Sequence, residues 1–315
     1  MNRSFAYCLL PIVYSLTLIM LHQKQVKSVL NKHKKRDSWF LDDYSVNPYE
    51  GCSCNCLYCY IRGSKYGENM EEGLTVKINA AEVLEKQLQS RTKKNQYGIV
   101  AIGSGTDAYI HQDEKYLLTR KFLSHLLKYR FPVFISTKRT GIKRDIELLS
   151  QIDKTAILPD DLKDSLKRGV ILSVSISTTD EKISGMLEPG AAPPAERLLL
   201  VKELSELGFL VGVNAIPSLP YISDTEEELE KTIAAAKEHK AHYILVGGLT
   251  LFGNAVADSK TLYYKFLERY NPDLIPKYDQ LYGGKFYTPR YYQDKLKQRA
   301  DKICLRYTIR NKIIE

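Results

Sequence analysis

Four of the six cysteines lie close together, and this crowding is the feature of the sequence most able to do chemistry. They are Cys52, Cys54, Cys56 and Cys59. Thiols so close in sequence are more typical of a metal centre than of disulfides, because a chain of 315 residues can bury a large core without covalent links. Intracellular thiols also stay reduced and free to bind metal, so we expect a cytoplasmic protein.

Three of these cysteines have the spacing Cys-x3-Cys-x2-Cys, at Cys52, Cys56 and Cys59. A tight loop of this kind can bind three irons of a [4Fe–4S] cluster, which usually takes four thiolates. The remaining iron is then open to the amino and carboxylate groups of S-adenosylmethionine (SAM). One electron passed to SAM would cleave its C5′–S bond and give a 5′-deoxyadenosyl radical that abstracts hydrogen, while the protein contributes placement and exclusion of water.

A structural zinc site is the alternative interpretation of the same loop. Structural zinc usually takes its ligands from two separated pairs, and no second Cys or His pair lies nearby in the sequence. Four such close cysteines could still close a zinc site by themselves. Cys54 is surplus to the three-ligand scheme, and we interpret it as a packed thiol.

Short β-branched segments alternate with longer segments of helical periodicity after the basic residues near position 30. The expected strands are Asp43–Asn47, Gly98–Ile102, Pro132–Ser136, Val170–Ser177, Phe209–Ala215 and Tyr243–Val246. The expected helices are Ala80–Ser90, Lys115–Tyr129, Arg144–Gln151, Pro194–Leu207 and Thr225–His239. This order predicts parallel strands with right-handed crossovers, in either an open doubly wound sheet or a barrel.

The fourth expected strand favours the barrel. Its alternation places aliphatic residues on one face and Ser173, Ser175 and Ser177 on the other. A strand in a sheet that helices cover on both sides should be apolar on both faces. The serine face therefore indicates a hydrated barrel interior that could hold a ligand, and the alternative is that the serines fill a tight core.

The segment Asn47–Tyr60 resembles the signature of the radical SAM superfamily, and more narrowly of its spore photoproduct lyase-like branch, which is labelled DNA repair photolyase-related. Further motifs of the branch follow in order at the ends of expected strands. They are Gly105–Thr106–Asp107 with Glu114, Ser136–Thr137–Lys138, Ser173–Thr178, Leu187–Gly190 running to Arg197, and Ala215–Pro220 followed by Asp224. The resemblance implies an α/β fold, a partial six-stranded parallel (β/α)6 barrel of the radical SAM type with a mainly helical C-terminal extension.

The resemblance also implies roles for residues at the carboxyl ends of the strands, where βα barrels carry their functional groups. The implied SAM contacts are Tyr58 for adenine, Gly105, Thr106 and Asp107 for the methionine amino end, Lys138 and Arg197 for the methionine carboxylate, and Ser175 and Glu188 for ribose or amino groups. Each has a plainer alternative: Lys138 as a solvated charge, Glu188–Arg197 as a surface ion pair, and Gly103–Asp107 as an ordinary turn.

One departure from the branch limits what the resemblance implies about the substrate. Spore photoproduct lyases carry a hydrogen-donating cysteine in the loop after the second strand, where this chain has Gly103–Ser104–Gly105. Cys304 could replace that thiol only if the C-terminal region folds over the barrel mouth, and a buried structural thiol is the alternative. We therefore do not expect repair of the thymine spore lesion.

Four segments are expected along the chain: an apolar segment at 1–22, a basic lead-in at 23–42, the core barrel at 43–249 and a Tyr/Lys-rich extension at 250–315. The first segment resembles a signal peptide or a short anchor, but Pro11 interrupts it and no small-residue cleavage site is evident. A start codon assigned too early, a packed or interfacial helix, and a real anchor remain open. We expect no stable membrane association.

The composition excludes a disordered or fibrous protein, with 44% hydrophobic and 26% charged residues. The net charge of +9 suits an anionic partner. The tyrosines, lysines and arginines after position 250 could bind a nucleic acid through its phosphates and bases, or could belong to helices with solvated charges and half-buried tyrosines.

The resulting hypothesis is a radical SAM enzyme with a [4Fe–4S] cluster, supplied by a one-electron reductant such as flavodoxin or ferredoxin, with nucleic acid as one candidate substrate. The alternative hypothesis is a non-catalytic nucleic-acid-binding protein whose cysteine loop holds a structural zinc or iron–sulfur site.

Overall fold

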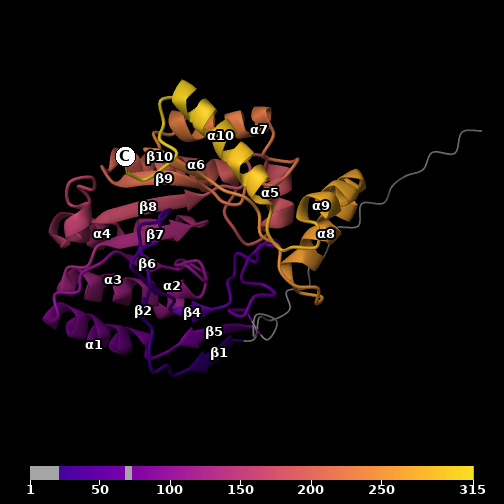
Figure 1. Cartoon of the computed structure of the whole chain (residues 1–315). Coiled ribbons are helices and arrows are strands. Elements are labelled where there is room, and N and C mark those ends of the chain that lie inside the picture. Colours follow the sequence, from indigo (N-terminus) through magenta and orange to yellow (C-terminus); the bar gives the residue numbers. More distant parts are fainter. Residues whose placement is uncertain (1–20, 68–72, 315) are drawn as a thin grey trace, which may run out of the picture.

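The computed structural model describes residues 21–67 and 73–314 (Figure 1). Within these residues, the strands form a seven-stranded sheet and a three-stranded sheet. In spatial order, the large sheet contains β10 (Tyr243–Val246), β9 (Leu210–Ala215), β8 (Val170–Ser175), β7 (Val133–Thr137), β6 (Val100–Ile102), β3 (Tyr44–Val46) and β2 (Asn31–Lys32). The small sheet contains β1 (Leu21–Lys24), β5 (Leu74–Lys77) and β4 (Tyr49–Glu50).

The strands from β3 to β10 in the large sheet are parallel, and each corresponds to one of the six expected strands. The seventh strand, β2, pairs antiparallel with β3 at one end of the sheet. Since β2 and β10 are the two ends of this sheet in the described residues, the barrel is partial. The expected α/β partial barrel is confirmed.

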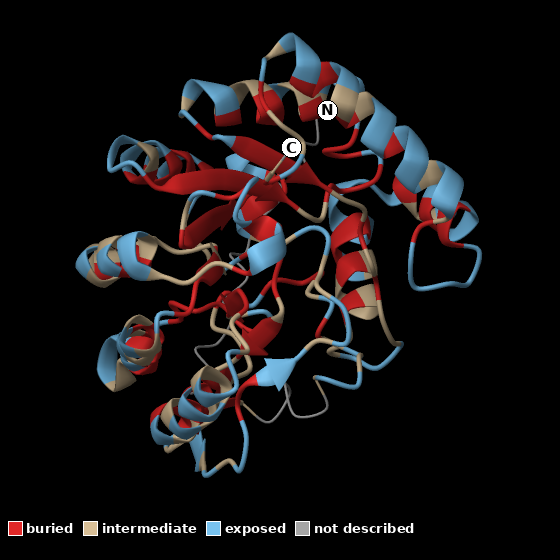
Figure 2. Ribbon diagram, turned by 60° about the vertical axis from the view of Figure 1, so that its left-hand side comes forward, coloured by how far each residue is buried: buried red, intermediate tan, exposed pale blue. Residues whose placement is uncertain are grey.

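Helices connect the parallel strands and cover the outer face of the sheet (Figure 1). These helices are α1 (Ala80–Lys93), α3 (Leu118–Tyr129), α4 (Ile146–Thr155), α6 (Pro194–Glu206) and α7 (Glu226–Glu238). The shorter α2 (Asp113–Tyr116) and α5 (Glu181–Leu187) lie in the connections after β6 and β8. Short 3-10 turns lie at Thr140–Asp145, Asp160–Leu162 and Pro272–Leu274. Figure 2 shows the parallel strands buried and the helices with exposed outer faces, so the main core lies between the two layers.

Local sequence signals explain where these helices begin and end. In α3, Leu118, Phe122 and Leu126 recur every four residues and are buried. Phe122 and Leu126 belong to the main core, and Leu118 packs in the cluster of the small sheet. The side chain of Thr225 accepts a hydrogen bond from the N–H of Glu228, as the expected capping pattern requires. These signals are local, and they predict the helix boundaries well.

The helix expected at Lys115–Tyr129 is wrong in one respect, because the chain breaks at Leu117. This residue has φ 54°, in the left-handed region, and it separates α2 from α3. The carboxylate of the buried Asp113 accepts a hydrogen bond from the N–H of Thr119 at 3.0 Å. That bond satisfies one of the N–H groups that a new helix leaves unpaired at its start.

The inside of the barrel changes character along its strands. Inward-facing residues such as Ile99, Phe134 and Ile171 pack into an apolar cluster near the amino ends. Ser173 is buried beside this cluster. Ser175, two residues further along the strand, lines a cavity at the carboxyl ends of the strands. The serine face therefore reaches a cavity only near the carboxyl end of the strand. Ser173 is packed in the core, as the alternative interpretation expected.

The C-terminal region is helical, as expected, with α8 (Ser259–Tyr270), α9 (Ile275–Tyr282) and α10 (Arg290–Arg306). Several of its tyrosines are core residues, because Tyr263, Tyr278 and Tyr282 are buried in one apolar cluster. Cys304 is buried in the main core, away from the barrel mouth. It is a structural thiol.

The interpretation of segment 1–22 lies almost entirely outside the described residues, of which only Leu21 and His22 belong to it and begin β1. Among the helices of the described chain, none has the length and apolar character needed to cross a bilayer.

Candidate functional site

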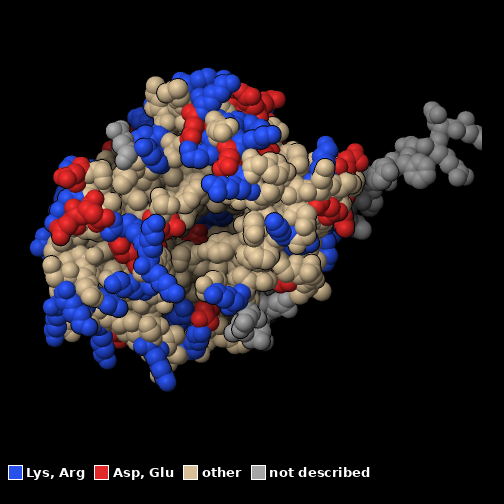
Figure 3. All heavy atoms as spheres, in the orientation of Figure 1, with Lys and Arg blue, Asp and Glu red and all other residues tan. Residues whose placement is uncertain are grey.

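A cavity of about 340 Å³ lies at the carboxyl ends of the barrel strands. Its walls are the cysteine loop, the segment 103–107, the ends of β7, β8 and β9, and residues 248–250. Figure 3 shows a hollow in this face of the molecule, with Lys and Arg side chains on either side of it. Pockets of about 300–1,000 Å³ are typical of small-molecule and cofactor sites.

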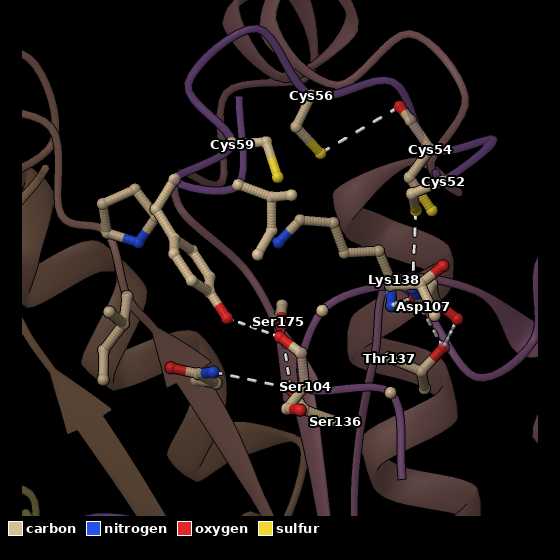
Figure 4. Close-up of a pocket in the computed structure, with 18 of the residues that line it drawn as sticks. Cys52, Cys54, Cys56, Cys59, Ser104, Asp107, Ser136, Thr137, Lys138 and Ser175 are labelled. Atoms are coloured by element: carbon tan, nitrogen blue, oxygen red, sulfur yellow. Dashed lines mark hydrogen bonds between the residues drawn. The ribbon is translucent and has the colours of Figure 1, made fainter. Parts of the chain in front are cut away.

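All four clustered cysteines line this cavity (Figure 4). The sulfurs of Cys56 and Cys59 face it from one side, and Cys52 lies across from them, where its Sγ accepts a hydrogen bond from the N–H of Asp107 at 3.4 Å. Within the described residues, no three Cys, His, Asp or Glu side chains converge on a position for a single ion. In a [4Fe–4S] cluster bound by three cysteines, each thiolate binds a different iron, so the three sulfurs need not converge on one point.

Cys54 lies beside Cys52 and is 1% exposed. A hydrogen bond between the two side chains lowers the pKa of Cys52 to about 7 and raises the pKa of Cys54. Of the two, Cys52 is therefore the readier thiolate, and thiolates are what bind metal. Cys54 and Cys56 are buried in the same apolar cluster, so burial does not distinguish the packed thiol from a ligand.

The cysteine loop is held from behind by the segment Leu187–Gly190. The N–H of Leu57 donates to the carbonyl oxygen of Leu187 at 2.8 Å, and the N–H of Gly190 donates to that of Cys54 at 3.0 Å. A Cβ atom on Gly190 would lie 1.9 Å from the carbonyl oxygen of Ser53, so only glycine allows this approach. This segment therefore shapes the loop that carries the sulfurs.

The segment Gly103–Asp107 holds the other side of the loop. Its Gly105 N–H donates to the side chain of Asn47 at 2.7 Å, and the Thr106 hydroxyl donates to the carbonyl oxygen of Gly51 at 2.7 Å. Gly103 has φ 83°, and a Cβ there would lie 2.7 Å from the carbonyl oxygen of Thr106. The segment is thus more than an ordinary turn, because it fixes the chain that enters the cysteine loop.

Asp107 uses its carboxylate to join two strand ends. It accepts hydrogen bonds from the Thr137 hydroxyl at 2.9 Å and from the N–H groups of Lys138 and Tyr109 at 2.7 and 2.8 Å. These protein donors occupy both carboxylate oxygens. In this arrangement Asp107 positions the cavity wall, and its N–H rather than its carboxylate is directed at the cysteines.

Lys138, Tyr58 and Glu188 form a charged group beside the sulfurs. The Nζ of Lys138 lies 3.6 Å from Oε1 of Glu188 and 5.8 Å from the centre of the Tyr58 ring. Burial alone would lower the pKa of Lys138, but the charges of Glu188 and Cys56 outweigh it and raise that pKa. Lys138 is therefore a charged ammonium that lines the cavity, and not a solvated strand-end charge.

Glu188 and Arg197 form an ion pair at 2.6 Å with side chains 1% and 0% exposed. Arg197 also donates to the carbonyl oxygen of Ser175 at 2.6 Å and to the Ser184 hydroxyl at 2.8 Å, while Glu188 accepts from the Tyr58 hydroxyl. Burial would raise the pKa of Glu188, but Lys138 and Arg197 lower it to about 2. The two charges are paired within the protein, and the Nε of Arg197 is buried without a hydrogen-bond partner.

This geometry corrects the expected roles of Glu188 and Arg197. The cavity is lined by every other candidate contact, namely Tyr58, Gly105, Thr106, Asp107, Lys138 and Ser175, but not by these two. They lie behind Tyr58 and Lys138, and their contacts are with protein groups. The surface-pair alternative is wrong as well, because the pair is fully buried.

Sequence reasoning missed several residues that line the cavity. They are Phe40, Asp42, Tyr60, Ser136 and Asn214. Alternation along β9 was a usable signal for Asn214, since Leu210 and Asn214 share the inward face. No comparable signal exists for Phe40 and Asp42, which reach the cavity from the irregular segment between β2 and β3.

The chain matches the family model of the radical SAM superfamily over residues 46–236. It is 27% identical over 297 residues to the uncharacterized protein Rv2578c of Mycobacterium tuberculosis, with 92% of this chain and 82% of that protein covered. It is also 27% identical over 200 residues to the uncharacterized protein ORF301 of Acidianus two-tailed virus, covering 60% of this chain and 61% of that protein.

Solved structures of spore photoproduct lyase have a similar fold. One variant superposes with a TM-score of 0.62 at 13% identity, covering 91% of this chain and 79% of the other. A second, with bound AdoMet and dinucleoside spore photoproduct, gives a TM-score of 0.61 at 14% identity, with the same coverage. The resemblance to this branch is thus confirmed for the fold. With its family-model match over more than half of its length, this chain belongs to the radical SAM superfamily.

Proposed function

We propose that this protein is a radical SAM enzyme whose [4Fe–4S] cluster is bound by Cys52, Cys56 and Cys59. When bound and reduced, such a cluster supplies one electron that cleaves SAM to methionine and a 5′-deoxyadenosyl radical, which abstracts hydrogen from a substrate. The observation that carries the proposal is that Cys52, Cys56 and Cys59, together with Cys54, line a single cavity at the carboxyl ends of a βα barrel.

The residues of the chain bind and orient the cofactor in this proposal. The Lys138 ammonium, below the sulfurs of Cys56 and Cys59 in Figure 4, is placed to bind the methionine carboxylate. The Tyr58 ring offers a face for the adenine, since its hydroxyl is already used by Glu188 and Ser177. Gly105, Thr106 and Ser175 bring polar backbone and hydroxyl groups to the same wall.

Anaerobic reconstitution with iron and sulfide tests the proposal. We expect about four irons per chain and 5′-deoxyadenosine on reduction in the presence of SAM. Cys52→Ala, Cys56→Ala and Cys59→Ala should each abolish 5′-deoxyadenosine formation. Cys54→Ala is the matched control and should retain it. A colourless protein with one tightly bound zinc would instead support a non-catalytic nucleic-acid-binding protein.

A nucleic acid is the substrate class we propose. Thr250 lines the cavity and pairs with Tyr287 in an isolated bridge, so the exposed rings of Phe286 and Tyr287 lie next to the mouth. The exposed Lys285 and Arg290 flank them in sequence. Rings can stack on bases and cations can bind phosphates. The dinucleoside lesion bound in a spore photoproduct lyase structure adds support, although that protein shares only the fold.

Fluorescence anisotropy with dye-labelled single-stranded DNA tests this substrate class. Replacing Phe286 and Tyr287 by Ala together should weaken binding about tenfold, as expected for lost base stacking. Leu305→Ala, which removes an exposed apolar side chain on α10, should leave binding unchanged. Binding that does not depend on salt would argue against a nucleic acid.

The electron donor we propose is a small one-electron carrier such as flavodoxin or ferredoxin. We also propose that the enzyme works in the cytoplasm, where thiols stay reduced and an oxygen-sensitive cluster persists.

A further inference from the structure

Arg62 is a charged residue beside the cysteine loop that the proposed function does not use. Its Nε donates to the carbonyl oxygen of Cys56 at 3.3 Å, and one terminal nitrogen donates to the side-chain oxygen of Asn55. The backbone N–H of Arg62 also donates to the carbonyl oxygen of Cys59, at 3.0 Å. Arg62 therefore contacts the loop at three points, two of which are residues that we propose as cluster ligands.

Arg62 also contacts the segment that leads into α8. Its second terminal nitrogen donates to the carbonyl oxygen of Ala257 at 3.4 Å, and its own carbonyl oxygen accepts a hydrogen bond from the Ser259 hydroxyl at 3.2 Å. A guanidinium presents its N–H donors in a rigid plane, so contacts with two segments fix where its charge lies. Arg62 is thus held between the cysteine loop and the C-terminal region.

The charge of Arg62 is not cancelled by an acidic partner. All three acceptors of its guanidinium are neutral oxygens, namely two backbone carbonyls and the Asn55 carboxamide. Among the ion pairs formed within residues 21–67 and 73–314, none includes Arg62, whereas the cavity cation Lys138 pairs with Glu188. Arg62 is only partly exposed, so solvent does not fully screen its charge.

We infer that Arg62 acts through the cysteine loop as a positioning residue, holding a positive charge that raises the reduction potential of the proposed [4Fe–4S] cluster. The electron carrier loses one electron and the cluster gains it. A nearby cation stabilises the more negative, reduced form more than the oxidised form. Net charge and solvent exposure are among the factors that set such potentials. The inference rests on the proposed function and deepens it, because it identifies a residue that makes the cluster easier to reduce.

A redox titration of the reconstituted full chain, followed by electron paramagnetic resonance, tests the inference through the midpoint potential. Arg62→Gln removes the charge and keeps an N–H donor. We expect its midpoint to fall by about 59 mV, which is a tenfold decrease in the equilibrium constant for one-electron reduction. Arg62→Lys keeps the charge and should stay close to the wild-type midpoint. An unchanged midpoint in Arg62→Gln, or an equal fall in both variants, would overturn the inference.

Lys65→Gln is the matched control for the loss of one positive charge. Lys65 is exposed, and its ammonium lies 5.0 Å from the centre of the Tyr66 ring. Its variant changes the net charge of the chain by the same amount as Arg62→Gln, and its midpoint should equal that of the wild type. If Lys65→Gln lowers the midpoint as far as Arg62→Gln does, the effect belongs to the overall charge and the inference is wrong.

A second route leaves Arg62 in place and does not depend on how its variants fold. Asn55 is exposed and has φ 51°, in the left-handed region that aspartate also adopts. Asn55→Asp would place a carboxylate against the guanidinium and neutralise it, so the midpoint should fall. Asn55→Gly removes the same hydrogen bond without adding a charge, and its midpoint should fall less. An unchanged midpoint in Asn55→Asp would contradict the inference.

Failure of the proposed function gives a different result from failure of this inference. If the wild-type chain assembles no [4Fe–4S] cluster, the proposed function and the inference fail together. If it assembles the cluster and cleaves SAM, but wild type, Arg62→Gln and Asn55→Asp share one midpoint, only the inference fails.

Discussion

The guanidinium of Arg197 lies 2.6 Å from the carboxylate of Glu188, in a part of the protein that water does not reach. This pair joins α6 to the end of α5. Through Glu188 it also fixes the hydroxyl of Tyr58 and the ammonium of Lys138, two groups that line the cavity. The pair thus supports the cavity wall from behind.

Removing one charge of this pair should strongly destabilise the fold. Arg197→Met leaves Glu188 buried beside a single remaining cation, and breaking such a pair typically costs about 3–5 kcal/mol. We expect a loss of this size in the free energy of unfolding measured by urea denaturation. Lys202→Met, an exposed position on the same helix, is the control and should change stability by less than about 0.5 kcal/mol. A similar small change for Arg197→Met would contradict the structure.

The low pKa of Glu188 predicts how this contribution depends on pH. The pKa of Glu188 is about 2 in the folded protein, below the ordinary pKa of a glutamate. The ionised carboxylate therefore stabilises the fold at every pH above that ordinary pKa, and this stabilisation is lost as the pH falls towards 2. The stability difference between wild type and Glu188→Gln should therefore be large at pH 7 and shrink between about pH 4.5 and pH 2.5. Denaturation curves at several pH values measure it, and a constant difference would refute the assignment.

Asp42 should show the opposite pH dependence. Burial raises its pKa to about 6, and the nearby His33 opposes this shift. A raised pKa means that the folded state holds its proton more tightly, so the native carboxyl stabilises the fold at low pH and this is lost as pH rises from about 4 to 6. Asp42→Asn should therefore gain stability relative to wild type between pH 4 and pH 7, by an amount on the order of 2 kcal/mol. The exposed Asp164→Asn should show no such trend.

The close approach of Gly190 to the cysteine loop predicts a specific defect in metal binding. A methyl group at this position would lie 1.9 Å from the carbonyl oxygen of Ser53, so Gly190→Ala must displace the loop. We expect reduced iron content after reconstitution with an unchanged circular dichroism spectrum. Gly185→Ala is the matched control, because a Cβ there meets nothing within 4 Å and the helix α5 gains about 0.5–1 kcal/mol. Full iron content in Gly190→Ala would show that the loop does not need this contact.

Most of the parallel sheet could be predicted from sequence, because β6, β7, β8 and β9 are apolar runs rich in β-branched residues and each is followed by helical segments. The three-stranded sheet could not, since β1, β4 and β5 have only two to four residues each and β1 pairs with β5, far along the chain. β5 alternates buried and partly exposed residues, but strands of two to four residues are too short to identify their pairing partner. Their pairing is decided by tertiary contacts.

The sequence predicted which residues belong to the candidate site, but not which of them line the cavity and which lie behind it. Tyr58, Lys138 and Ser175 follow strand ends or the cysteine motif, and the topology brings such positions to one edge. Glu188 and Arg197 carry the same kind of motif signal, yet they lie one layer further back. Sequence spacing does not show which charged residue faces a cavity and which lies behind it. Lys138 and Arg197, for example, both pair with Glu188, but only Lys138 lines the cavity.

The hydrogen bonds from Leu57 to Leu187 and from Gly190 to Cys54 have a consequence for how the protein is made. The ribosome synthesises the cysteines long before the segment Leu187–Gly190 that gives their loop its final shape. The cysteine loop therefore lacks these two hydrogen bonds until the second half of the barrel has been synthesised and has folded. Insertion of the proposed cluster would accordingly follow synthesis of the segment Leu187–Gly190, because this segment shapes the cysteine loop.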